Sequence, residues 1–150
     1  MTAEELLQKF DMSAHPENGA FAERHYAHEG ADRASSGSIY YYVAPQEKTE
    51  FHRIDCDEYW CYTAGSTLEF WQVDADGRLK ISLLGTEGEA EPFVFVKRGT
   101  VFASKHRKGA KDGTFLVCIT VPRFSYEGFE LIPKARMIKE YPAAAPFFEE

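Results

Sequence analysis

Cysteine is scarce in this 150-residue chain, and its arrangement argues against covalent cross-links. The three cysteines are Cys56, Cys61 and Cys118, so their number is odd and no C-x-x-C motif occurs. A disulfide framework or a structural zinc knuckle needs paired or closely spaced thiols. We therefore expect reduced thiols and a cytoplasmic protein.

Basic residues are also in deficit. The chain has 17 Lys and Arg residues against 24 Asp and Glu residues, which gives a formal net charge of −7. An acidic surface repels phosphate backbones, so nucleic-acid binding is not expected. The one basic run, residues 105–108, has Lys111 just beyond it and lies close to Gly109 and Gly113. That pattern predicts an exposed hairpin loop with solvated charges rather than a phosphate site.

Long apolar runs are absent as well. A membrane-spanning helix needs roughly 20 apolar residues in succession, and no run in the sequence approaches that length. The acidic N-terminus also lacks the pattern of a signal peptide. We therefore expect no association with a membrane.

Aromatic residues, in contrast, are plentiful. Hydrophobic residues make up 44% of the chain and aromatic residues 15%, with 12 Phe and 8 Tyr. Such residues favour β-strands and can form the walls of an apolar pocket. The length suits a single domain over residues 1–150, with a core spanning about residues 5–142.

Short runs rich in β-forming residues follow one another through most of the sequence. We expect strands at residues 38–43, 51–54, 59–63, 68–73, 79–84, 93–96, 100–103 and 114–121. Residues 74–77 end in Gly77 and predict a hairpin turn between two of these strands. Many short strands separated by turn signals are typical of an all-β barrel or sandwich.

Helices are expected only near the two ends. Thr2 and Glu5 have the spacing of a capping box and predict a helix over residues 2–10. A closing helix over residues 133–141 begins at Pro133 and stops before Pro142. The remaining tail, residues 143–150, is expected to be loosely held.

The segment 51–65 has the richest chemistry. Glu58, Trp60 and Tyr62 alternate and therefore share one face of a strand. His52 precedes Glu58 by six residues. A histidine and a carboxylate that meet in an apolar cavity form an acid/base pair. The alternative interpretation is a hydrogen-bonded wall histidine beside a glutamate that faces solvent.

This segment resembles the first motif of the cupin superfamily, in which two histidines precede a glutamate and a glycine. His52, Glu58 and Gly65 match that spacing, and Gly99 matches the turn of the second motif. Residues 15–19, 51–60, 64–65 and 128–131 further resemble a small subfamily, cupin type five, whose members are largely of unknown function. The resemblance covers about residues 5–142. It implies a jelly-roll β-barrel with short terminal helices, commonly dimeric, with a pocket in the barrel mouth.

The chain departs from the metal-binding pattern of the superfamily. Ile54 and Phe102 occupy positions where the resemblance calls for histidine ligands, and neither side chain can bind a metal. Cys61 stands where relatives usually carry histidine, but strand alternation points it away from Glu58 and predicts a buried apolar role. We therefore expect no cofactor. A divalent metal held weakly by His52 and Glu58 is the alternative.

Other polar and aromatic residues complete the candidate site. Glu130 is a further catalytic candidate, as the alternative acid to Glu58. The candidate ligand-binding residues are Trp60, Tyr62, Phe102, Tyr40 and Glu23. A surface or turn position is the alternative for Glu23, Tyr40 and Glu130, and it is the favoured interpretation for Tyr40.

The sequence hypothesis is a small-molecule cupin that binds a polar, sugar-like ligand without metal. It would act as an epimerase or isomerase, with His52 as base and Glu58 or Glu130 as acid or orienting group. This chemistry is implied by resemblance to metal-free sugar epimerases of the superfamily. The alternatives are a non-catalytic binding or storage module and a degenerate metal-dependent enzyme. A homodimer is expected, because cupins commonly pair through edge strands.

Overall fold

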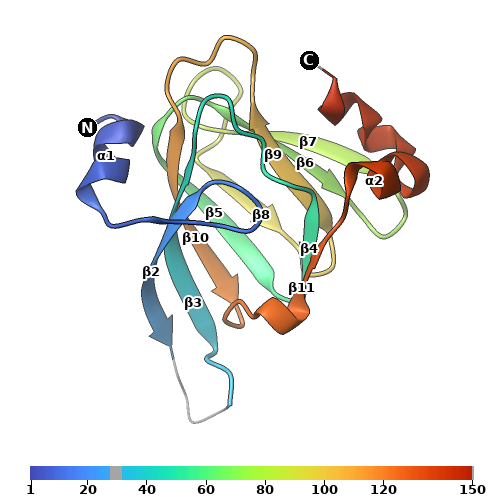
Figure 1. The fold of residues 1–150 in the computed structure, drawn as a ribbon, viewed down its shortest axis with the longest axis horizontal. Coiled ribbons are helices and arrows are strands. Elements are labelled where there is room, and N and C mark those ends of the chain that lie inside the picture. The colour runs from blue at the N-terminus through green and yellow to red at the C-terminus, as the bar shows by residue number, and fades with distance from the viewer. Residues whose placement is uncertain (28–31, 150) are drawn as a thin grey trace.

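The computed structural model describes residues 1–27 and 32–149, and two antiparallel β-sheets make up most of it (Figure 1). In spatial order, the six-stranded sheet contains β1 (Ser13–Ala14), β2 (Ala20–Ala27), β3 (Ser36–Val43), β10 (Thr114–Val121), β5 (Asp57–Gly65) and β8 (Phe93–Val96). The five-stranded sheet contains β11 (Phe129–Leu131), β4 (His52–Ile54), β9 (Val101–His106), β6 (Leu68–Val73) and β7 (Leu79–Leu84). The two sheets face each other as an all-β jelly-roll barrel, which confirms the expected fold class.

Helices lie only near the chain ends, as expected. Helix α1 (Ala3–Lys9) begins at the capping box of Thr2 and Glu5, and α2 (Lys134–Glu140) follows Pro133. Two 3-10 helices, η1 (Tyr126–Gly128) and η2 (Pro142–Phe148), complete the set in the described part of the chain. None of these helices is both long and apolar enough to cross a membrane.

Aromatic side chains fill much of the space between the sheets. Trp60 packs its ring against Phe70 at 4.4 Å and against Tyr41 at 5.3 Å, both edge to face. These rings are almost completely buried, together with Phe102 and Leu116. Such edge-to-face contacts are favourable beyond the area that they bury. The aromatics of β5, β6 and β9 are therefore mainly core.

A second apolar cluster lies on the opposite face of the five-stranded sheet, beneath the C-terminal helices (Figure 1). Phe147 is 2% exposed and contacts Phe51 at 4.6 Å and Trp71 at 5.5 Å between ring centroids. We expected residues 143–150 to be loosely held, but η2 packs firmly on the sheet. The burial of Ala144 and Phe147 holds this segment in place, and Glu150 lies outside the described residues.

The basic run at residues 105–108 differs from the expected exposed loop. Strand β9 continues through His106, which is buried and bonds Thr114 Oγ1 at 2.7 Å through Nε2. The Lys105 ammonium group lies 5.0 Å from the ring centroid of Trp71 and donates to the carbonyl oxygen of Phe147 at 2.9 Å. Long basic side chains can cover apolar surface while the charged end keeps a hydrogen-bond partner. Only the latter half of the run is an exposed turn.

Candidate functional site

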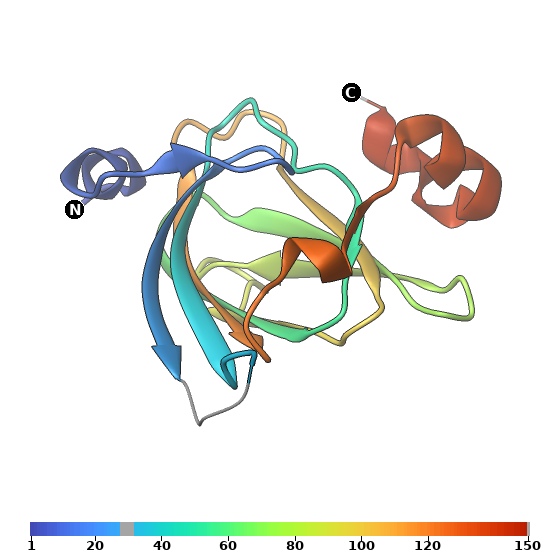
Figure 2. The ribbon, with the colours of Figure 1, turned by 60° about the horizontal axis from the view of Figure 1, so that its bottom comes forward.

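A cavity of about 730 Å³ lies inside the barrel between the two sheets. Its inner wall includes His52 and Ile54 from β4, Glu58 from β5, and Cys118 from β10. The segment before β2 contributes His15 and Glu17, and the segment around η1 lies between β10 and β4 (Figure 2). The volume is within the usual range for small-molecule sites.

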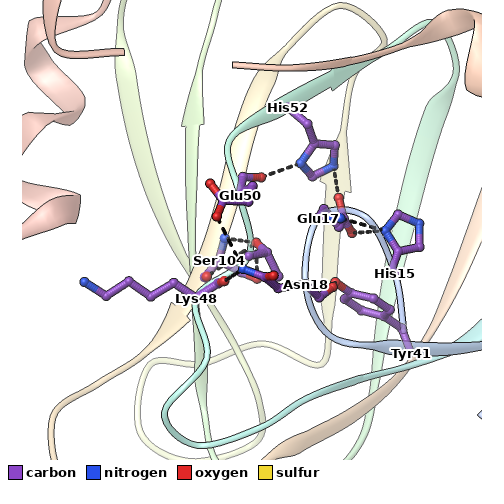
Figure 3. A network of polar contacts seen from close by, with 9 residues as sticks. His15, Glu17, Asn18, Tyr41, Lys48, Glu50, His52 and Ser104 are labelled. Carbon is purple, nitrogen blue, oxygen red and sulfur yellow. Dashed lines mark hydrogen bonds and ion pairs between the residues drawn. The ribbon is translucent and has the colours of Figure 1, made fainter. Parts of the chain in front are cut away.

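A buried ion pair between Glu17 and His52 dominates the inner wall (Figure 3). His52 Nδ1 donates to the backbone oxygen of Glu50 at 2.7 Å, while Nε2 contacts the Glu17 carboxylate. Since a carbonyl oxygen can only accept, Nδ1 must carry a proton, and Nε2 needs a second one to face a carboxylate. The pair therefore holds an imidazolium and a carboxylate, with side chains 3% and 7% exposed.

The pKa values of both partners move in the direction that favours the charged pair. Burial alone would lower the pKa of His52, but the charge and hydrogen bond of Glu17 outweigh it, so the pKa is raised. Burial alone would raise the pKa of Glu17, but the charge and hydrogen bond of His52 outweigh it, so the pKa is lowered. Each partner keeps the other ionised without contact with bulk water.

A tight turn explains why Glu17 points inward. Asn18 and Gly19 both have positive φ, at 77° and 80°. The Tyr41 hydroxyl donates to the Asn18 carbonyl at 2.5 Å, and the Glu50 amide donates to the Glu17 carbonyl at 2.7 Å. A Cβ atom on residue 19 would lie 2.6 Å from the Tyr41 hydroxyl, so the turn needs glycine there.

His15 lies beside the pair but is neutral. Its Nδ1 accepts the backbone N–H of Glu17 at 3.2 Å, so it has no proton to offer the Glu17 carboxylate 3.9 Å away. Burial lowers the pKa of His15 more than the Glu17 charge raises it. The proton of the neutral ring is therefore on Nε2, where it is available to a ligand.

Glu58 is the second carboxyl group of the cavity and has the opposite protonation state. Burial and the nearby negative charge of Glu17 raise its pKa to about 8, despite the positive charge of His52. The side chain is only 7% exposed. Because its pKa lies above 7, the carboxyl group carries a proton at neutral pH. Two carboxyl groups with pKa values pushed apart are a common arrangement for an acid and a base.

The structure brings some of the sequence-predicted residues together. His52 and Glu58 share the cavity, and Glu23 lies at its exposed rim, 4.0 Å from Arg123. Trp60 and Phe102 are not cavity-lining residues, because both are packed in the core. Phe102 supports the site from behind, with its ring centroid 4.1 Å from that of His52.

The remaining candidates lie away from the cavity. Glu130 is on the outside of β11, where it forms ion pairs with Arg53 at 3.0 Å and Arg136 at 2.7 Å. Tyr40 packs under α1 and Tyr62 donates its hydroxyl proton to the Gly65 carbonyl at 2.6 Å. Glu130 of β11 is the register partner of Arg53 of β4, so the two side chains lie on the same face of the sheet. That face is the outer one, where the two side chains form their ion pair.

Glu17, His15 and Cys118 are cavity residues that sequence reasoning did not identify as site residues. The sequence marks residues 15–19 only through the family resemblance. The usable signal was the Asn18-Gly19 pair, since two residues suited to positive φ can fix a neighbouring side chain. Nothing in the local sequence indicates that this turn meets β4.

The residues present do not fit a three-histidine, one-glutamate metal site. Both ring nitrogens of His52 already have partners, and the other two positions are Ile54 and Phe102. Within residues 1–27 and 32–149, no three or more His, Cys, Asp or Glu side chains are grouped to hold a metal ion. Cys61, half-buried on the other face of β5 from Glu58, adds no ligand to the cavity.

The two facing sheets and the cavity between them define a cupin-type barrel. A family model described as Cupin superfamily (DUF985) matches residues 4–132, so the chain belongs to this family and the resemblance seen in the sequence is confirmed. A search of curated proteins finds no match.

Two solved structures are similar over nearly their whole length. Protein SO0799 from Shewanella oneidensis has a TM-score of 0.87 at 25% identity, covering 97% of this chain and 93% of that one. A hypothetical protein from Leishmania major has a TM-score of 0.84 at 26% identity, covering 97% and 95%. Oxalate decarboxylase from Bacillus subtilis shares the fold alone, with a TM-score of 0.62 at 15% identity over 90% of this chain and 35% of that one.

Proposed function

We propose that this protein binds a small, polar, uncharged molecule in the barrel cavity and moves a proton on it. The observation that carries this proposal is the placement of two buried carboxyl groups in one cavity, with Glu17 in contact with His52 and Glu58 outside that ion pair. This placement lowers the pKa of Glu17 and raises that of Glu58 to about 8. Glu17 serves as the base and Glu58 as the acid. This assignment replaces His52 as base, because His52 is held in its protonated form by Glu17.

The charge of the inner wall supports an uncharged ligand. Glu17 and His52 neutralise each other, while Glu58 and His15 are neutral at pH 7. A net charge on the ligand would be costly to bury at this inner wall, and the cavity-lining arginines Arg33 and Arg123 already face the carboxylates of Asp55 and Glu23. The side chains of Phe21 and Phe124 supply apolar wall beside the polar groups. A carbohydrate derivative combines such polar and apolar surfaces.

Isomerisation or epimerisation is the chemistry that fits these groups. Glu17 takes the proton from a carbon next to a carbonyl group, and Glu58 donates its proton to the carbonyl oxygen. Glu17 then gives its proton to the neighbouring carbon of the enediol, and the other enediol hydroxyl returns a proton to Glu58, which restores both groups and completes the isomerisation. General acid and base groups of this kind contribute about 10²–10⁴-fold each to a rate.

Ligand screening tests the binding half of the proposal. Neutral aldoses and ketoses, sugar acids and nucleotide-linked sugars are added to the full chain and its melting temperature is measured. We expect a neutral sugar to raise the melting temperature. If none of these compounds does so, the carbohydrate class is wrong.

Proton exchange tests the chemical half. Each sugar that binds is incubated in deuterated water and its C–H signals are followed by NMR. We expect exchange with the wild type, and a loss of about 10²-fold or more with Glu17→Gln and with Glu58→Gln. Glu140→Gln, an exposed change on α2, is the matched control and should exchange normally. Binding without exchange would overturn the catalytic role and leave a non-catalytic binding module.

A further inference from the structure

The cavity has a mouth whose side chains differ from those of its inner wall. The inner wall holds Glu17, His52 and Glu58, which are all buried. The mouth is formed by the charged and tyrosine side chains of the same lining that remain at least partly exposed: Glu23, Tyr26, Asp32, Arg33, Arg123, Tyr126 and Glu127. The cavity volume of about 730 Å³ exceeds what a single sugar ring fills, so the mouth has room for a second chemical group.

Tyr126 is an exposed aromatic side chain at this mouth. It is 59% exposed although it lines the cavity. Its position is well defined, because Ser125 caps η1 and the ring lies nearly perpendicular to those of Phe124 and Phe129, with centroids 5.0 Å and 6.2 Å away. The face of an aromatic ring carries negative charge density, which attracts the C–H groups on the apolar face of a sugar ring. Tyr126 therefore offers a preformed stacking surface outside the inner wall.

Polar side chains at the mouth are available to the hydroxyl groups of such a ring. Arg123 and Glu23 approach only to 4.0 Å, and their side chains are 44% and 58% exposed, so both retain polar atoms for a ligand. The guanidinium of Arg123 is held 3.8 Å from the ring centroid of Tyr26. The Tyr26 hydroxyl is buried without a hydrogen-bond partner among residues 1–27 and 32–149. A ligand hydroxyl would remove the cost of leaving it unpaired.

The charges of the mouth favour a neutral group over a phosphate. The guanidinium of Arg33 already forms two hydrogen bonds to the Asp55 carboxylate, at 2.9 Å and 3.1 Å. Arg123 faces Glu23, and Asp32 and Glu127 add two further negative charges to the lining. An anionic group would meet this excess of negative charge, whereas a neutral sugar would not.

We propose that the mouth binds the second sugar ring of a neutral reducing disaccharide, an assignment that rests on the proposed function. Only the reducing unit of a disaccharide opens to a carbonyl compound, so that unit must lie against Glu17 and Glu58 for proton transfer. The other unit then lies at the mouth, stacked on Tyr126 and hydrogen-bonded by Arg123 and Glu23. A glycosidic bond to an oxygen away from the carbonyl carbon and its neighbour leaves both carbons free to react.

Isothermal titration calorimetry of the full chain tests the mouth. Glucose is compared with cellobiose, maltose and lactose, which all carry glucose as the reducing unit. We expect one of these disaccharides to bind at least ~10-fold more tightly than glucose. Tyr126→Ala should bring the affinities for that disaccharide and for glucose to the same value, because the stacking surface is lost. Tyr126→Phe keeps the ring and should preserve the difference, as should Phe93→Ala, an exposed aromatic of β8 that does not line the cavity.

The outcomes separate this inference from the proposed function. If glucose binds but every disaccharide binds no more tightly, the second subsite is wrong and the proposed function stands. A disaccharide preference that Tyr126→Ala leaves unchanged would equally overturn the subsite. If no neutral sugar binds at all, the carbohydrate class fails, and the subsite fails with it.

Glucose-6-phosphate tests the charge of the mouth. The negative charges of Asp32 and Glu127 should make it bind more weakly than glucose, and Glu127→Gln should narrow the difference. Glu140→Gln, an exposed change on α2, is the matched control and should leave the difference unchanged. Tighter binding of glucose-6-phosphate than of glucose would show that the mouth holds an anion, which would overturn the neutral disaccharide.

Discussion

At the scale of single residues, the cavity shows how position decides the protonation of identical groups. Glu17 and Glu58 are both buried glutamates. Glu17 contacts the imidazolium of His52, which keeps it ionised. Glu58 lacks such a partner and feels the negative charge of Glu17, which keeps it protonated. The difference between an acid and a base at this site therefore comes from one ion pair.

Glu58 makes a testable contribution to the pH dependence of stability. Its pKa is about 8 in the folded chain and about 4.5 when unfolded, so the folded state binds the extra proton between these values. Stability must then fall by about 1.4 kcal/mol per pH unit from this group as pH rises through that window. Glu58→Gln removes this contribution.

Urea denaturation at several pH values between about 5 and 9 measures the effect. As pH rises, the free energy of unfolding of Glu58→Gln should increase relative to that of the wild type. The other titrating groups contribute equally to both proteins, so they cancel in the difference. Parallel curves for the two proteins would show that Glu58 is ionised at neutral pH in the folded state.

At the scale of elements, a turn and two strands assemble the site. The Asn18-Gly19 turn before β2 places Glu17, β4 places His52, and β5 places Glu58. The turn is held by the Tyr41 hydroxyl from β3 and by the chain just before β4. Strand alternation explains why Glu58 points inward. The presence of Glu17 in the same cavity is explained only by the packing of the Asn18-Gly19 turn against β3 and the chain before β4.

Gly19→Ala should destabilise the protein more than an equivalent change elsewhere. Its φ is 80° and a Cβ atom would lie 2.6 Å from the Tyr41 hydroxyl, so we expect a loss of about 2–4 kcal/mol. Gly77 has the same φ of 80° with open space around it, so Gly77→Ala should cost only about 1 kcal/mol. Chemical denaturation compares the two. Equal losses would mean that the contact with Tyr41 adds nothing to backbone strain.

At the scale of the whole molecule, two apolar clusters share the five-stranded sheet. Trp60 belongs to the cluster inside the barrel, and Trp71 to the cluster beneath α2 and η2. The strands β6 and β9 contribute to both, since alternate residues of a strand point to opposite faces. The clusters should therefore melt together.

The two tryptophans of the chain allow this cooperativity to be measured. Trp60→Phe leaves only Trp71 as reporter, and Trp71→Phe leaves only Trp60. We expect the fluorescence melt of each variant to coincide with its own far-ultraviolet circular dichroism melt, as a single two-state unit requires. An earlier transition seen only through Trp71 would instead reveal a C-terminal segment that detaches separately.

The strand pattern could be predicted from sequence because alternation and turn residues are local signals. The runs at 68–73, 79–84, 93–96 and 114–121 match β6, β7, β8 and β10 at both ends. The prediction that residues 143–150 are loosely held was wrong, because the contacts that fix this segment are not local. Nothing local marks Phe147 as buried, and its contacts with Phe51 and Trp71 join distant parts of the chain.

The sequence by itself determined the barrel, its terminal helices and the family, and it singled out His52 and Glu58. These features depend on neighbouring residues and on spacing, which the chain carries whatever its tertiary contacts. Only the tertiary structure decided that Glu17 joins His52, that Glu130 lies outside, and that Trp60 of β5 packs in the core instead of lining the cavity. The protonation state of a buried group depends on which charged group lies near it. The distance between the two groups is set by the fold and not by their separation in the sequence.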